Sequence, residues 1–200
     1  VKALIGTYND AREVGKFVLF NIAKTEEIEA SCLKAIESIP AGQLIPGKSL
    51  TLHKKYLNDL PVLLRVYVGC ALQLYGELDD IQLVKIHFHS GKVSFMGYDN
   101  FDDSPLPLLR ERVKVKLEQQ AVDYFDYVGR YTQQPLYFKS AYLTEDYPNY
   151  KKQVSFDKRI KQLMPENTRY GLKLDALQKV LDANQLEIKG FRFYTKKNVE

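Results

Sequence analysis

The chain has no tryptophan, only two methionines and two cysteines, and no apolar run near the roughly 20 residues of a membrane-spanning helix. It also lacks the pattern of a signal peptide. Cys32 and Cys70 show no CxxC or Cys/His spacing, and each lies in an apolar helical pattern. We therefore predict two buried free thiols, and neither a disulfide nor a zinc site. We expect a soluble, cytoplasmic protein with no membrane partner.

Short motifs that mark nucleotide-dependent and hydrolytic enzymes are missing as well. The sequence contains no P-loop, no GxSxG nucleophile motif and no GxGxxG-type turn after a strand. Without that glycine-rich turn, nothing in the chain is expected to bind S-adenosylmethionine or a dinucleotide. The sequence therefore predicts no cofactor and no metal ion in this chain.

What is present is the composition of an ordinary globular domain. Hydrophobic residues make up 45% of the chain and charged residues 27%, so disorder is not expected. The net charge is +4, from 29 basic and 25 acidic residues. This balance permits binding to nucleic acid without requiring it, so only local clustering of the bases can indicate such a partner.

Residues 1–76 form the predicted helical N-terminal portion. Apolar residues recur every three or four positions from 1 to 38, with a second helix start at Thr25. A short extended segment is possible at 49–52. Asn58 or Asp59 is the expected cap of a core helix from Leu60 to Tyr75, which Gly76 ends.

Residues 77–200 are predicted to form an antiparallel sheet followed by helices and a closing strand. Apolar and polar residues alternate at 84–88, 93–96 and 112–117, with a hairpin turn at Ser90-Gly91, and 121–128 is predicted as a fourth strand. Segment 130–150 is expected to wrap the sheet. Helices are expected at 151–164 and 171–183, the second capped by Thr168, before a strand at 185–194. The predicted fold class is α+β, in one compact domain.

A strip of basic residues is the first candidate for function. Residues two apart on a strand share a face, so Arg112, Lys114 and Lys116 are predicted to project together. Lys85 and His87 lie on the polar side of another strand. If both polar sides belong to one sheet face, these side chains form a cationic strip suited to phosphates. The alternative is a solvated face, in which lysines protect a sheet edge from pairing.

An acidic loop is the second candidate. Asp99 and Asp102 follow a strand, as does Asp103, and His87 is near through the hairpin. Carboxylates at a strand end can hold Mg²⁺, and nearby bases would complete a phosphodiesterase site. The alternative is that these residues only form a turn, because Asp, Asn, Ser and Pro favour turns. His53 is interpreted as a cap or packing residue.

Several segments, in order, resemble one protein family. They read GTY at 6–8, HKKYLNDLP at 53–61, LLRVYVGCA at 63–71, LVKIH at 83–87, KVSF at 92–95, YDNFD at 98–102, PLY at 135–137, DYP at 146–148, TRYG at 168–171 and LEIKGFR at 186–192. This order resembles the C-terminal region of the bacterial family of DNA phosphorothioation-associated proteins classed as methyltransferases. Phe88-His89 departs from the family, which tends to carry Arg and Lys there.

The resemblance implies a place beside phosphorothioate-modified DNA in a bacterial restriction-modification defence. It implies a methyltransferase portion, with S-adenosylmethionine as its cofactor, preceding this region. The start at Val1, without Met or a helix cap, suggests a fragment that lacks that portion. No catalytic residue is implied for this chain, because the cofactor motif is not in it.

Three functions follow as hypotheses. The first is a non-catalytic DNA-binding or target-recognition domain that contacts phosphates through Lys85, Arg112, Lys114 and Lys116. The second is a Mg²⁺-dependent phosphodiesterase centred on Asp99, Asp102 and His87. The third is a structural module that packs on the missing catalytic portion through apolar residues of the first helix, such as Leu4, Tyr8 and Val18.

Overall fold

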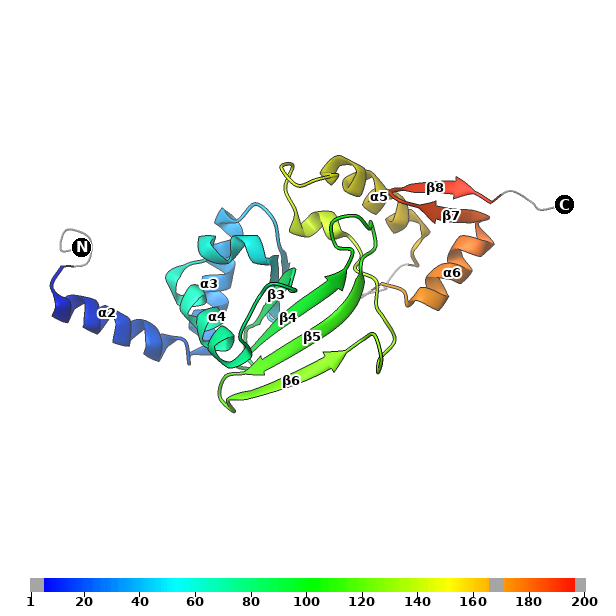
Figure 1. Cartoon of the computed structure of the whole chain (residues 1–200). Helices are drawn as coiled ribbons and strands as arrows, with labels where there is room; N and C mark the ends of the chain where they lie inside the picture. The colour runs from blue at the N-terminus through cyan, green and yellow to red at the C-terminus, as the bar shows by residue number, and fades with distance from the viewer. Residues whose placement is uncertain (1–5, 166–170, 197–200) are drawn as a thin grey trace.

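Six strands form one antiparallel sheet in sequential order, β1 to β6, in the computed structural model, which describes residues 6–165 and 171–196. The fold is α+β, as predicted, with helices on either side of the sheet (Figure 1). The strands are β1 (Gln43–Ile45), β2 (Ser49–His53), β3 (Leu83–His87), β4 (Lys92–Asp99), β5 (Leu108–Lys116) and β6 (Ala121–Asp126).

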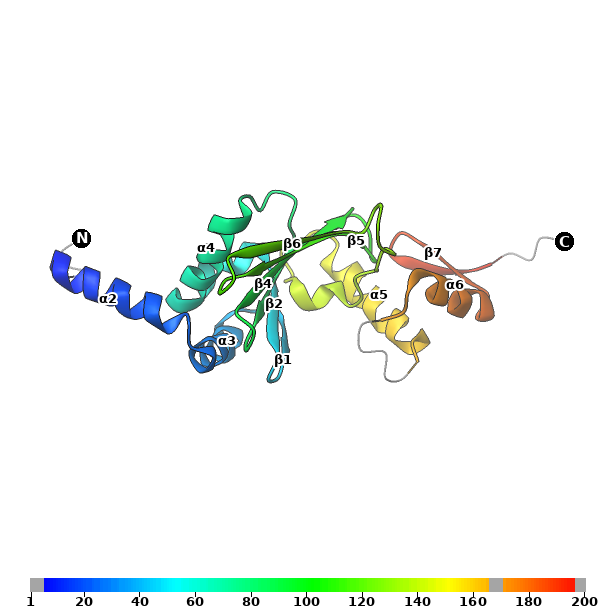
Figure 2. The same ribbon diagram turned by 90° about the horizontal axis from the view of Figure 1, so that it is seen from below.

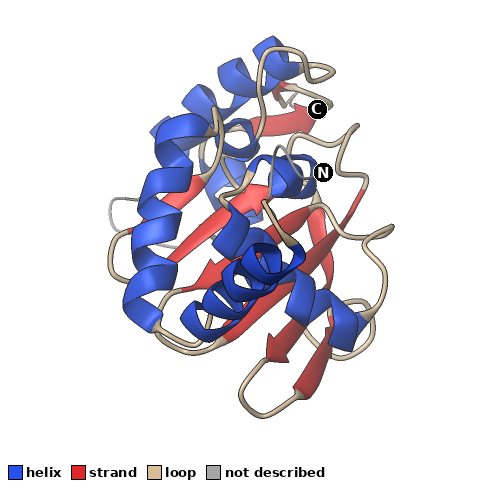
Figure 3. Cartoon of the chain, turned by 90° about the vertical axis from the view of Figure 1, so that its left-hand side faces the viewer, coloured by secondary structure: helices blue, strands red, loops and turns tan. Residues whose placement is uncertain are grey.

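One face of the sheet is covered by two helices, α3 (Thr25–Ser38) and α4 (Val62–Tyr75). Helix α4 buries Leu64, Val68 and Ala71 against this face, because apolar residues surround most of its circumference. The sheet contributes the residues that alternate toward the helices, including Ile86, Phe95 and Val113. This is the main core, and we call this side the closed face; Figure 3 shows helices in front of the strands.

The other face is covered only at one end. There Leu83, Met96 and Leu109 pack against residues of the segment that follows β6, notably Tyr127 and Tyr142. The covering elements are η2 (Lys139–Tyr142) and α5 (Tyr150–Leu163). Figure 2 shows α4 and α5 on opposite sides of the sheet. We call this side the open face, since its other end carries polar side chains.

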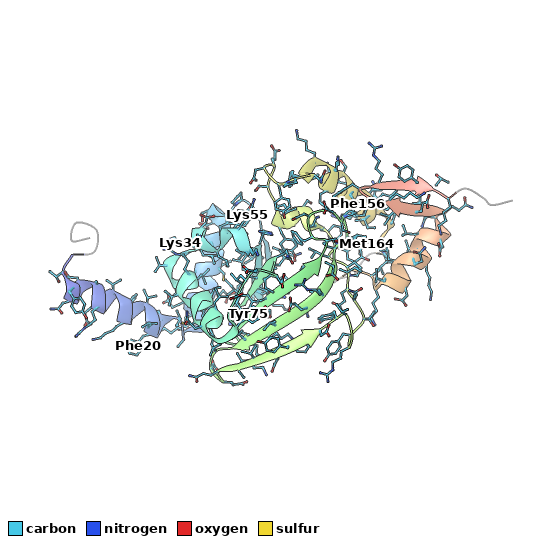
Figure 4. The ribbon with its side chains drawn as sticks, in the orientation of Figure 1. Phe20, Lys34, Lys55, Tyr75, Phe156 and Met164 are labelled. Atoms are coloured by element: carbon cyan, nitrogen blue, oxygen red, sulfur yellow. The ribbon has the colours of Figure 1, made fainter. Side chains whose placement is uncertain are left out.

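A third cluster forms around the C-terminal elements α6 (Leu174–Ala183), β7 (Leu186–Lys189) and β8 (Arg192–Thr195). Phe156 of α5 stacks on Phe193 of β8 with ring centroids 4.9 Å apart, and Figure 4 shows Phe156 in this part of the molecule. Within the described part of the chain, strands β7 and β8 pair only with each other, through a turn at Gly190 with φ of 54°. The single closing strand predicted at 185–194 is therefore a hairpin.

Two strands in the first 76 residues enlarge the predicted sheet. Strand β2 pairs with β3 along its whole length, and β1 pairs with β2. The segment predicted only as a short extended piece is thus an inner strand, and β1 was missed. Residues on either side of position 76 consequently share one sheet.

The start of the core helix differs from the prediction. Residues 54–59 form a 3₁₀ helix, η1 (Lys54–Asp59), and α4 begins at Val62 with Pro61 at its N-cap. Proline disfavours helical geometry in the residue before it, and Leu60 is extended with ψ of 147°. Asn58 and Asp59 therefore cannot cap α4. Gly76 does end this helix, with φ of 111°.

Other predicted positions mostly hold. His53 caps η1, because its Nδ1 accepts the backbone N–H of Lys55 at 3.2 Å. Cys32 is buried, whereas Cys70 is only half-buried, and both are free. The predicted cap Thr168 and the helical residues 1–5 lie outside the described residues.

Helix α2 (Tyr8–Asn21) extends away from the rest of the molecule (Figure 1). Thr7 and Asp10 form a capping box at its start. Phe17 is 70% exposed and Phe20 is 75% exposed, and Figure 4 shows Phe20 on this extension. No helix in the described ranges has the length and apolar character needed to cross a membrane.

Candidate functional site

Strand register brings the predicted basic residues onto the open face. Lys85 lies opposite Ser94, and Ser94 lies opposite Lys114. Directly opposed residues of antiparallel strands share a face, so Lys85 and Lys114 project to the same side. Arg112 and Lys116, two residues either side of Lys114, project there too. The polar sides of β3 and β5 therefore form one surface, which we call the basic face.

His87 belongs to the same surface. Its Nε2 lies 3.1 Å from the Ser94 hydroxyl of the next strand, and Ser49 lies opposite it on β2. The predicted set for phosphate contact, together with His87, is thus brought together: Lys85, His87, Arg112, Lys114 and Lys116.

Four residues of the basic face, Lys85, His87, Arg112 and Lys114, line the floor of a groove with a cavity volume of about 570 Å³. The wall comes from residues 134–138 and 171–173, which are joined where the Tyr137 hydroxyl donates to the Leu172 carbonyl at 2.9 Å. Among the described residues that line the groove, the charged ones are Lys85, Arg112, Lys114 and Lys173, and none is acidic. A second cavity of about 360 Å³ adjoins it and shares Ile45, Lys85 and His87. We call this second cavity the side pocket.

The positive charge of the basic face is concentrated enough to shift the pKa values of its own side chains. The pKa of His87 is lowered to about 4, first by burial and then by the charges of Lys85 and Lys114. Burial also lowers the pKa of Lys114, and the charge of Arg112 lowers it further. Burial disfavours any charge, whereas the contribution of the neighbouring cations reflects a positive potential, which would stabilise an anion bound there.

Two of the cations are held against aromatic rings. The Lys114 ammonium lies 4.7 Å from the ring centre of Phe125, and the Arg112 guanidinium lies 5.6 Å from that of Tyr127. The buried Arg112 Nε has no hydrogen-bond partner among the described residues. Lys116 differs, because its Nζ forms an ion pair with Asp123 at 2.7 Å. Lys116 is therefore less available for a ligand than Arg112 or Lys114.

The acidic loop lies elsewhere. His87 is level with Lys92, the first residue of β4, because Ile86 is opposite Val93. Asp99 ends the same strand, seven residues on (99 − 92), which is about 20 Å at the rise of a strand. Asp102 accepts a hydrogen bond from the Tyr147 hydroxyl. The structure therefore does not bring His87 to Asp99 and Asp102.

Within residues 6–165 and 171–196, no three His, Cys, Asp or Glu side chains are grouped as ligands for a metal ion. The loop instead surrounds a buried cation. Lys139 is only 1% exposed, and its ammonium donates to the carbonyls of Phe101 and Ser104, the latter at 2.7 Å. Burial lowers its pKa to about 8, although the charge of Asp102 opposes this effect. Lys139 thus fixes the loop conformation.

Sequence reasoning missed the neutral polar residues of the groove and its side pocket. Thr51 lies opposite Lys85, and Ser49 is 1% exposed with no hydrogen-bond partner for its hydroxyl. Gln134 comes from the wall. The only available signal was that Ser49 and Thr51 alternate with Leu50 and Leu52, which is the pattern of a strand with one polar side.

Comparison of the chain with protein-family models, curated proteins and solved structures gives no match in any of the three.

Proposed function

We propose that this chain is a non-catalytic DNA-binding module whose basic face contacts phosphates through Lys85, Arg112, Lys114 and Lys116. The observation that carries the proposal is the register of β3, β4 and β5, which places these four side chains on one face of the sheet. Three of them, Lys85, Arg112 and Lys114, line the floor of one groove. Phosphate contacts supply most of the affinity of DNA-binding proteins. These contacts require cationic side chains more than they require a particular fold.

The alternative, that lysines only protect a sheet edge, fits the structure poorly. The edges of the sheet are β1 and β6, whereas the cations lie on the inner strands β3 and β5. Their backbone groups already pair on both sides, so no edge there needs protection. Part of this face is also covered, so a purely solvated surface does not explain why Arg112 and Lys114 are half-buried.

The resemblance to DNA phosphorothioation-associated proteins supports DNA as the ligand. In that setting the module would recognise or hold DNA beside a methyltransferase portion, within a bacterial restriction-modification system. The test of the DNA-binding function does not depend on that setting.

A triple neutralisation, Arg112→Gln with Lys114→Gln and Lys116→Gln, tests the function. Each lost phosphate contact removes about 0.9 from the slope of log K against log salt concentration. Because Lys116 is already paired with Asp123, we expect the loss of about two contacts, which lowers affinity on the order of 10²-fold near 0.1 M salt. Fluorescence anisotropy over a salt series measures both quantities.

The matched control neutralises three exposed lysines of α5, Lys151→Gln, Lys158→Gln and Lys161→Gln. It removes the same net charge from residues that line neither cavity. The control should keep most of the salt slope of the unmodified chain. If both triple variants lose affinity equally, the basic face has no special role and the proposal fails.

A second role is favoured by α2. Its exposed apolar residues include Tyr8, Val14 and Phe17, and Val18 is half-buried. Monomeric soluble proteins rarely expose contiguous apolar surface of this kind, which more often marks an interface. The helix would then pack on another protein body, the methyltransferase portion in the setting above, while the groove remains available to DNA.

A further inference from the structure

The geometry points to an unpaired nucleic-acid strand, rather than a duplex, as the ligand of the groove. We propose that its phosphates follow the basic face from Lys114 toward Ser49, and that one of its bases stacks beside Lys114 on Phe125 and Tyr131. This inference rests on the proposed DNA-binding function and specifies the form of nucleic acid that the site accepts.

The size of the site is the first argument. A volume of about 570 Å³ is that of a cavity that encloses one small organic molecule. The cations lie on the floor of the groove, which residues 134–138 and 171–173 border as a wall. A duplex is too wide to enter such a groove, so its phosphates could reach only the rim. A single strand can enter a few nucleotides at a time.

The second argument is the continuity of the path. The groove and the side pocket share Ile45, Lys85 and His87, so an extended chain could pass from one into the other. In the side pocket, the Ser49 hydroxyl is buried without a hydrogen-bond partner, beside Lys48. A buried hydroxyl without a partner is costly, and a phosphate oxygen would satisfy it.

The third argument is the aromatic surface next to the cations. Phe125 lies on the open face, because it is opposite Arg112, and its ring is 6.0 Å from that of Tyr131. Tyr131 is 48% exposed. Single-strand-binding proteins combine cations for the backbone with aromatic rings on which bases stack. In a duplex the base faces are covered by their neighbours, so this surface would contribute nothing.

Neutral polar groups complete the pattern. Thr51 and Gln43 lie in the same cross-strand row as Lys85, and Gln134 faces them from the wall. Side chains of this kind can pair with the edges of bases that are not paired with another strand. The row can therefore contact the Watson–Crick edges of bases, which only an unpaired strand exposes.

The experiment compares a fluorescein-labelled oligothymidylate with a labelled hairpin duplex that has the same number of phosphates. We expect the single strand to bind at least about tenfold more tightly. We also expect Tyr131→Leu to weaken binding of the single strand about fivefold or more, which is the low end for one stacked base. Binding of the duplex should be unaffected by this substitution.

Tyr124→Leu is the matched control. Tyr124 is on the same strand as Phe125 but on the other side, because it is opposite Val113 of the main core, and it is 64% exposed. Its replacement should leave both affinities unchanged. Because Tyr124 and Tyr131 are both exposed, we expect both leucine variants to fold. Circular dichroism checks this.

The outcomes separate the two proposals. If the duplex binds as tightly as the single strand, and both lose affinity in the Arg112, Lys114 and Lys116 triple variant, the single-strand inference is overturned and the DNA-binding function stands. A Tyr131→Leu variant with unchanged single-strand affinity would also overturn the stacking proposal. If neither oligonucleotide binds, both proposals fail.

Discussion

At the scale of a single residue, His87 shows how the surroundings in the groove change the pKa of a side chain that lines it. Burial and neighbouring cations lower its pKa to about 4, from a usual value of 6.5. His87 is therefore neutral in the folded protein at neutral pH, and its Nε2 can pair with the Ser94 hydroxyl. Under the proposed function, a neutral imidazole would contribute a hydrogen bond, and no charge, to a phosphate bound in the groove.

The same pKa makes the stability of the fold depend on pH. Between pH 6.5 and about 4 the unfolded chain binds a proton at His87 that the folded chain does not, so stability falls as the pH is lowered through this window. We expect His87→Gln to reduce this acid-induced loss, measured as the free energy of unfolding in urea at several pH values. Part of the acid-induced loss of stability should remain in the His87→Gln variant, because burial lowers the pKa of His53 to about 4 as well.

Comparable slopes of stability against pH in the unmodified and His87→Gln proteins would contradict this assignment. The double variant with His53→Gln should have the shallowest slope of all. A steeper slope of stability against pH in the His87→Gln protein than in the unmodified protein would mean that His87 is protonated in the folded state.

At the scale of elements, strand β4 contains an irregularity that limits which residue can occupy position 97. The register between β4 and β5 shifts between Gly97 and Tyr98. A Cβ at position 97 would lie 2.7 Å from the Asp80 carbonyl oxygen and 2.9 Å from a Glu111 carboxylate oxygen. The Asp80 carbonyl already accepts a hydrogen bond from Arg110 at 3.2 Å, so it cannot move away freely.

Gly97→Ala should therefore destabilise the protein by about 1–3 kcal/mol, the usual cost of an overpacked site. Gly69→Ala is the control, because position 69 is inside α4 and a Cβ there meets nothing within 4 Å. It should stabilise the protein by about 0.5–1 kcal/mol through helix propensity. Urea unfolding measures both. Equal effects of the two substitutions would contradict the close approach at the irregularity.

For the whole molecule, the unusual feature is the exposed α2. The four successive residues 17–20 are Phe, Val, Leu and Phe, which surround the helix at 100° per residue and so cannot all face one core. A helix that is apolar all round is normally buried. Here Phe17, Leu19 and Phe20 are exposed to water, and Val18 is half-buried.

We expect the isolated chain to associate in a concentration-dependent manner through this helix. Phe17→Ser with Phe20→Ser should reduce that association without a large change in the unfolding midpoint, since both residues are exposed. Sedimentation velocity over a concentration series measures the first effect, and thermal unfolding the second. A monomeric unmodified chain at all concentrations would show that the exposed surface does not drive association.

Periodicity alone determined much of this protein. Apolar alternation predicted strands near 84–88 and 93–96, and the helical spacing of apolar residues predicted the core helix that ends at Gly76. These signals succeed because a half-buried strand and a helix each expose one side to water. The extra strand β1 escaped prediction because three residues are too few to show alternation.

Only the tertiary structure decided which basic residues share one surface. The sequence placed Arg112, Lys114 and Lys116 on one side of a strand, but joining them to Lys85 required the register of three strands. The same register separates His87 from Asp99, which the hairpin had appeared to bring close. Spacing along one strand is set by local geometry, whereas neighbours across strands depend on turns, bulges and packing that no single segment encodes.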